Sequence, residues 1–356
     1  MPNEFDEYRP PQEPRKRGRK GGRQDGRKGG HNRSIGAGGQ DGSKEVRVAE
    51  DFEFSDYYGK PVVKAPPWEW PIGAYLFLGG VAGGSALLAA GAQATGNAPL
   101  RTATRLTAFG AAGAGSAMLV LDLGRPERLL NMFRVFKLSS PMSVGSWILA
   151  SFGAASSLPA LSELARKPLP LANAAGIIAG VLGGPLAAYT AVLLGDTSNP
   201  VWSDTRGHLP YVFVSSAALA SSGVAMVTTP VANAAPARTV AMVGAAADLA
   251  ATRKMEETMQ PETVRHLHRT KLMKAAEVLV AVGGVGTVAA AVTKSKAVSV
   301  LAGVALAAGS CCTRFGILEA GLASAQDPQA VIGPQSRRAK ERRQSQGLEG
   351  DVISTS

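Results

Sequence analysis

The sequence predicts an all-α fold, a polytopic membrane bundle of about eight transmembrane helices with disordered polar termini. Three observations support this fold class. Nearly all charged residues lie before about residue 68, after about residue 324, or in a few short connections. Between these limits run apolar stretches of about 20 residues, the length that crosses the ~30 Å hydrocarbon core of a bilayer. These stretches are rich in glycine, alanine and serine, which is typical of closely packed membrane helices.

Each apolar stretch defines one expected helix. The eight expected spans lie near residues 71–95, 103–123, 143–165, 172–195, 209–230, 236–253, 273–293 and 297–318. The sixth is the weakest because it is short and contains Asp248, and counting it as a soluble helix would leave seven spans. The expected organisation is a disordered basic tail over residues 1–66, a transmembrane domain over 67–322 and a polar basic tail over 323–356.

Lysine and arginine are distributed unevenly between the two sides of the expected bundle. The side that holds the N-terminus carries 30 of them and the opposite side 7; without the tails, the short loops still give 11 against 7. Because positive loops stay in the cytoplasm, both termini of this multi-pass protein are expected on the cytoplasmic side of the plasma (inner) membrane. The net charge of +11 then reflects topology and attraction to anionic lipid headgroups, and no nucleic-acid partner is expected.

Cysteine and histidine exclude two kinds of redox centre on this chain. The two cysteines, Cys311 and Cys312, are too few for a cysteine-ligated iron–sulfur cluster, which needs about four thiolates. The four histidines are His31, His208, His266 and His268, and none falls inside an expected span. The bis-histidine ligation of a membrane b-type haem is therefore not expected, and no group of residues predicts a metal site.

Tyrosines and ionisable residues gather at one membrane depth, in the half of each span that lies on the same side of the membrane as the N-terminus. Tyr75 lies about one turn into the first span, and Tyr189 lies about 10 Å from the inner end of the fourth, at 1.5 Å per residue. A tyrosine hydroxyl at this depth needs a hydrogen-bonding partner, and both a quinone carbonyl and a neighbouring backbone carbonyl suit that role. Asp248, Glu277 and Arg314 are ionisable residues within spans, where charge usually pairs, lines a wet cavity or reaches back to the interface. These three are candidates for a proton pathway.

A second group of polar residues lies where helices end on the same side. Asp122 ends the second span and is followed by Arg125 and Arg128, while Asp196 ends the fourth span and Trp202 follows it. An aspartate at a helix C-terminus is disfavoured by the helix dipole, so neutralisation by a nearby arginine is the plain structural interpretation. Docking of a partner subunit is compatible with it.

Four motifs, in order and at helix boundaries, resemble the NrfD/PsrC family, the membrane subunits of polysulfide reductase-like (molybdopterin oxidoreductase) complexes. They are Trp68–Tyr75 running into Phe77–Gly84, Asp122–Arg128, Pro141–Trp147, and Tyr189–Gly195 followed by Asn199–Trp202. The resemblance covers residues 68 to about 320.

The resemblance implies a subunit without a redox centre of its own. Such a subunit passes electrons between the quinone pool, menaquinone or ubiquinone, and a four-cluster iron–sulfur partner that connects to a molybdopterin catalytic subunit. The family places its quinone pocket at the partner-facing end, using positions that Tyr75 and Tyr189 match, although some members carry histidine at the first. The complex would be polysulfide reductase-like or formate dehydrogenase-like and serve anaerobic respiration.

Two other classes of function remain open. A purely structural anchor of such a complex would use the same loops and leave Tyr75 and Tyr189 as packing residues. A secondary transporter would suit Asp248 and a fourth helix disturbed by Gly183-Gly184-Pro185. The two halves of the chain show no repeat, which disfavours the transporter.

Overall fold

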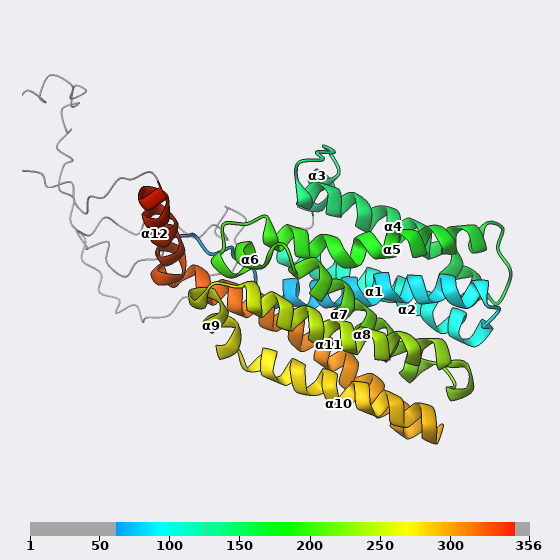
Figure 1. Cartoon of the computed structure of the whole chain (residues 1–356). Helices are drawn as coiled ribbons and strands as arrows, with labels where there is room; N and C mark the ends of the chain where they lie inside the picture. The colour runs from blue at the N-terminus through cyan, green and yellow to red at the C-terminus, as the bar shows by residue number, and fades with distance from the viewer. Residues whose placement is uncertain (1–61, 126, 346–356) are drawn as a thin grey trace, which may run out of the picture.

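The computed structural model describes residues 62–125 and 127–345, and in this part of the chain all regular secondary structure is helical. Eight long helices lie side by side and form one elongated bundle (Figure 1). They are α1 (Trp70–Ala94), α2 (Ala98–Asp122), α4 (Pro141–Ala165), α5 (Ala172–Gly195), α7 (Leu209–Thr228), α8 (Ala235–Thr258), α10 (Lys271–Thr293) and α11 (Lys296–Ala325). They correspond in order to the eight expected spans, while most of the expected N-terminal tail lies outside the described residues.

The described residues hold twelve α-helices, four more than the eight expected transmembrane spans. The additional ones are α3 (Arg128–Met132), α6 (Pro200–Thr205), α9 (Pro261–Arg269) and α12 (Pro328–Ser345), and a 3-10 turn spans Val231–Asn233. Three of these short helices, α3, α6 and α9, occupy connections that are polar or short and carry no membrane-length apolar signal. Pro200 and Pro261 stand at helix starts, where the fixed φ of proline favours helix initiation.

Helix α12 corrects the expectation of a disordered C-terminal tail. Asp327 precedes the helix, and its Oδ1 accepts a hydrogen bond from the backbone N–H of Gln329 at 2.9 Å. Its carboxylate also contacts Arg265 and His266 of α9. Burial alone would raise the pKa of Asp327, but the Gln329 N–H, His266 and Arg265 together hold it below its ordinary value. These contacts, and an ion pair of Arg337 with Glu262, hold α12 against α9, and Ala330 and Val331 at the start of α12 are buried.

Six of the eight long helices are long and apolar enough to cross a membrane: α1, α4, α5, α7, α10 and α11. The exceptions, α2 and α8, carry more charge: α2 contains Arg101 and Arg105, and α8 contains Asp248 and ends in a charged segment that starts at Arg253. Both nevertheless run along the bundle, α2 against α1 and α8 against α7 and α10 (Figure 1).

Small residues bring the helix axes close together, as the glycine pattern predicted. A Cβ at Gly183 of α5 would lie 2.4 Å from the carbonyl oxygen of Gly83 in α1, and the reverse distance is also 2.4 Å. Gly223 of α7 and Gly303 of α11 meet in the same way. A side chain at any of these positions would overlap backbone, so glycine is required there. The helix α5 continues through Pro185 without interruption.

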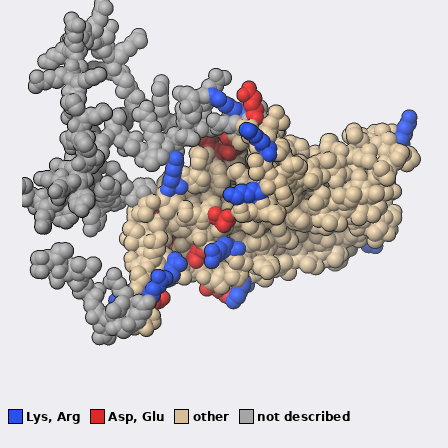
Figure 2. All heavy atoms as spheres, turned by 90° about the horizontal axis from the view of Figure 1, so that it is seen from above, with Lys and Arg blue, Asp and Glu red and all other residues tan. Residues whose placement is uncertain are grey.

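The bundle has two halves that meet along α1 and α7. Helices α1, α2, α4 and α5 pack together around one apolar cluster, and α7, α8, α10 and α11 pack around another. Charged side chains gather at one end of the molecule, and few mark the other end (Figure 2). We call these the charged end, where α6, α9 and α12 lie, and the far end.

Candidate functional site

Tyr75 lies inside the α1/α2/α4/α5 half. Its side chain is only 4% exposed, and its ring faces Gly115 of α2, where a Cβ would lie 3.6 Å from Cδ2 of the tyrosine. No described residue forms a hydrogen bond with the Tyr75 hydroxyl. A tyrosine hydroxyl in apolar surroundings usually has a hydrogen-bonding partner, so the Tyr75 hydroxyl is free to bond a further group.

Tyr189 comes from α5 and packs in the same half of the bundle. Its ring covers Gly145 of α4 so closely that a Cβ there would lie 2.2 Å from Cε2. The ring also borders the apolar cluster that includes Phe77, Leu78 and Phe152. Leu78 and Tyr75 both face Gly115, so the two predicted tyrosines adjoin one cluster of side chains. Neither is hydrogen-bonded to a described residue.

A line of polar side chains crosses the interior of the other half. The Ser215 hydroxyl of α7 donates a hydrogen bond to Oδ1 of Asp248 at 3.2 Å, and Asp248 is 3% exposed. Arg314 of α11 is fully buried; its Nη2 donates to the carbonyl of Phe213 at 2.6 Å, and its guanidinium lies 3.8 Å from the centre of the Phe213 ring. Arg314 and Asp248 are not in direct ion-pair contact, but their opposite charges attract each other through the interior.

Arg314 has free hydrogen-bonding capacity in this interior. Its Nε and Nη1 are buried and have no hydrogen-bond partner. Gly80 of α1 makes room for it, since a Cβ there would lie 3.1 Å from Nη2. Glu277, the third residue of the predicted proton pathway, is exposed on α10, so the structure does not bring it to the Asp248–Arg314 pair.

The predicted docking residues lie at helix ends. Asp122 is the last residue of α2, Arg128 is the first of α3, and Asp196 caps α5 and is exposed. Arg125 lies between the first two, and its buried Nε has no hydrogen-bond partner.

Trp202 differs from the other docking candidates because it is fully buried. Its indole N–H donates to the carbonyl of Ile317 at 2.9 Å, and its ring stacks on Trp68 with 5.3 Å between ring centroids. A Cβ at Gly321 would overlap the indole ring. Trp202 therefore holds α6 against α11, and direct contact with a partner does not fit this burial.

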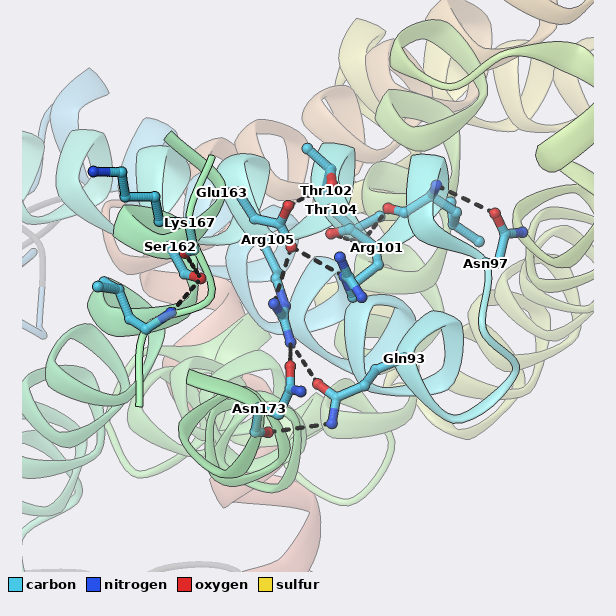
Figure 3. A network of polar contacts seen from close by, with 12 residues as sticks. Gln93, Asn97, Arg101, Thr102, Thr104, Arg105, Ser162, Glu163, Lys167 and Asn173 are labelled. Carbon is cyan, nitrogen blue, oxygen red and sulfur yellow. Dashed lines mark hydrogen bonds and ion pairs between the residues drawn. The ribbon is translucent and has the colours of Figure 1, made fainter. Parts of the chain in front are cut away.

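A polar network at the far end (Figure 3) was not expected from the sequence. Arg105 is 4% exposed, and its Nη1 donates to Oε1 of Glu163 at 2.9 Å. Its Nη2 donates to Oδ1 of Asn173 at 2.9 Å and also to the side chain of Gln93. Arg101 and Thr102 donate to the same Glu163 carboxylate. The network joins α1, α2, α4 and α5, and the signal for it was a set of opposite charges at the same ends of the expected spans.

A comparison with protein families identifies the chain. The model of the family described as "Polysulphide reductase, NrfD" matches residues 62–325, more than half of the chain. The chain belongs to the NrfD family. This confirms the resemblance read from the four motifs, and a comparison with curated proteins finds no match.

Membership of the NrfD family and the six apolar helices agree with each other. Together they show a multi-pass membrane protein of the type found in polysulfide reductase-like complexes. The matched region contains both tyrosines, the Asp248–Arg314 pair and the far-end network, and it stops where α11 ends.

Proposed function

We propose that this NrfD protein is the quinone-reactive membrane subunit of a respiratory oxidoreductase. The observation that carries the proposal is Tyr75, whose side chain is buried in an apolar half-bundle and whose hydroxyl has no hydrogen-bonding partner among the described residues. A quinone carbonyl supplies the acceptor that this phenol lacks. The chain then acts without a catalytic centre of its own.

The surroundings of the two tyrosines fit an isoprenoid quinone. A small-molecule site needs an apolar lining with a few placed polar groups. Phe77, Leu78 and Phe152 provide apolar surface beside Tyr189, and the two phenols provide the polar groups. Oxidation of a menaquinol or ubiquinol releases two electrons and two protons. In this proposal the electrons pass to a four-cluster iron–sulfur partner, and the chain binds and orients the quinone without haem or a cluster of its own.

Protons need a separate route, and Asp248 and Arg314 are our candidates for it. Buried ionisable residues inside a membrane bundle are costly and usually serve ion or proton transfer. Ser215 already links α7 to the Asp248 carboxylate, and the unpartnered Nε–H and Nη1–H groups of Arg314 can donate hydrogen bonds to a water molecule. Glu277 lies on the exposed face of α10, so it would exchange protons with this route only through water or another molecule at that face.

We place the iron–sulfur partner, and through it a molybdopterin catalytic subunit, at the charged end. Asp122, Arg125 and Asp196 lie at or beside helix ends there and would contribute charged groups to a docking surface, and Arg128 begins α3 beside them. The lysine and arginine distribution assigns this end, and both termini, to the cytoplasmic side of the cell membrane. The start of α1 and α12 lie at the same end of the bundle (Figure 1), as an even number of crossings requires.

Purification of the tagged protein from its own membranes in a mild detergent tests this assignment. We expect an iron–sulfur protein to co-purify and to show cluster signals in electron paramagnetic resonance, with no b-type haem absorbance that follows this chain. Asp122→Asn should reduce the amount of partner retained, because it removes a charge at the docking end.

Glu257→Gln is the matched control, since Glu257 is an exposed carboxylate in α8 whose ion-pair partner among the described residues is Lys254. It should retain the partner at the wild-type level. Purification of the chain without any iron–sulfur protein would contradict the proposal and favour a transporter. A partner that is retained without quinone-dependent turnover would favour the structural anchor.

A further inference from the structure

An open groove runs along the outside of the second half, between α7 and α8. Its volume is about 950 Å³. Along α8 it extends from Thr239 to Lys254, which is roughly 22 Å at the helical rise per residue. The lining residues on which binding depends are His208, Tyr211, Val214, Ala218, Val243 and Lys254.

The middle of the groove is apolar. Val214, Ala218, Val240 and Val243 form its walls, and Val243 is 65% exposed toward the groove and its surroundings. The hydroxyl of Ser215 is the polar group nearest the centre, but it is already used in a hydrogen bond to the buried Asp248. The central part therefore suits a hydrocarbon chain and offers no free donor to the carbonyls of a quinone ring.

One end of the groove is polar and carries positive charge. Lys254 lies there with a largely exposed side chain, and its ion pair with Glu257 at 3.2 Å is also exposed, so it is weak. His208 stands at the start of α7 with Nδ1 3.3 Å from the Thr258 hydroxyl, which leaves Nε2 for another contact. Tyr211 adds an exposed aromatic ring at the same level, as is common where a bilayer meets water.

We propose that this groove is a binding site for an anionic phospholipid. One acyl chain lies between α7 and α8, and the phosphate contacts Lys254 and His208 at the charged end. Charge complementarity selects the headgroup, since basic pockets between membrane helices bind acidic lipids. The site depends on the membrane location of this NrfD protein and not on the quinone reaction at Tyr75 and Tyr189.

Photolabelling of the full-length protein tests the site. The protein is reconstituted in phosphatidylcholine vesicles that contain a trace of phosphatidylglycerol with a diazirine-bearing acyl chain, and the labelled peptides are mapped. We expect label to concentrate on residues 209–228 and 235–258. The same diazirine chain on phosphatidylcholine should label these segments several times less.

Two variants distinguish the contribution of the lipid headgroup to binding from that of the acyl chain. Lys254→Gln should lower phosphatidylglycerol labelling of α7 and α8 about fivefold, the effect of one lysine near an anionic lipid surface, whereas Lys274→Gln on α10 should leave it unchanged. Val243→Trp fills the groove and should reduce labelling by both lipids. Val285→Trp, at an exposed position of α10, is its control for added bulk.

Three results would overturn the proposal. Label spread evenly over all the exposed helices would show ordinary contact with the bilayer. Equal labelling of α7 and α8 by the two lipids would remove the role of Lys254 and His208. Displacement of the label by a short-chain quinone would assign the groove to quinone. Loss of the tyrosine-dependent quinone reaction leaves all three readouts unaffected, so this test and that of the proposed function can fail separately.

Discussion

Replacement of Arg314 by methionine is expected to destabilise the protein by about 1–3 kcal/mol, because the buried Phe213 carbonyl loses a charged donor and Asp248 loses a nearby cation. Asp248 is 3% exposed, and its described hydrogen bond comes from Ser215. Without Arg314 the carboxylate loses the buried cation that stabilises it. Unfolding in mixed micelles of dodecyl maltoside with increasing sodium dodecyl sulfate measures the change.

The double variant Arg314→Met/Asp248→Asn provides the matched control. It removes both charges and keeps the shapes close to the originals, so part of the lost stability should return, giving a coupling free energy that the single variants cannot show. Proton-coupled turnover should stay low in the double variant if the pair carries protons. Equal stability of Arg314→Met and the unsubstituted protein would show that the two charges are not coupled.

Replacement of Arg105 by methionine is the second large effect, about 3–5 kcal/mol. Arg105 donates to three side chains from three other helices, those of Gln93, Glu163 and Asn173. Its loss leaves their acceptor groups without this donor in an enclosed network that connects α1, α2, α4 and α5 (Figure 3). The same unfolding titration measures the change.

Arg101→Met is the comparison for Arg105→Met. Arg101 contacts the same Glu163 oxygen at 3.0 Å, but its side chain is 32% exposed, so its removal should cost about 1 kcal/mol or less. Similar losses for the two variants would mean that burial does not determine the strength of this network.

The course of the eight long helices could be predicted from the sequence because each is set by local signals. An apolar run of membrane length defines the helix, and prolines near the first turns of α1, α2 and α4 mark its start. The close approach of Gly83 to Gly183 followed from the same small-residue pattern. Helix α12 could not be predicted from local sequence signals, because it is held by contacts of Asp327 and Arg337 with α9, about 60 to 77 residues away in the sequence.

The residue types of the candidate site could be predicted from the sequence, but the contacts between those residues could not. Tyr75, Tyr189, Asp248 and Arg314 were recognisable as polar groups at depth. The direction in which a helical side chain points depends on packing against neighbours, which is why Glu277 lies outside the pair and Trp202 is buried. The Arg105–Glu163 contact joins residues 58 positions apart, and no local pattern connects them.

The most direct test of the central claim is quinone-dependent turnover of the complex with Tyr75→Phe and with Tyr189→Phe. Each variant keeps the ring and removes one hydroxyl, which typically costs about 0.5–1.5 kcal/mol, or up to roughly tenfold in quinone affinity. We expect the KM for quinone to rise in both variants while the iron–sulfur partner is retained, and to stay unchanged in Tyr211→Phe. Wild-type rates and KM in both Tyr75→Phe and Tyr189→Phe would contradict the proposed site and favour a purely structural anchor.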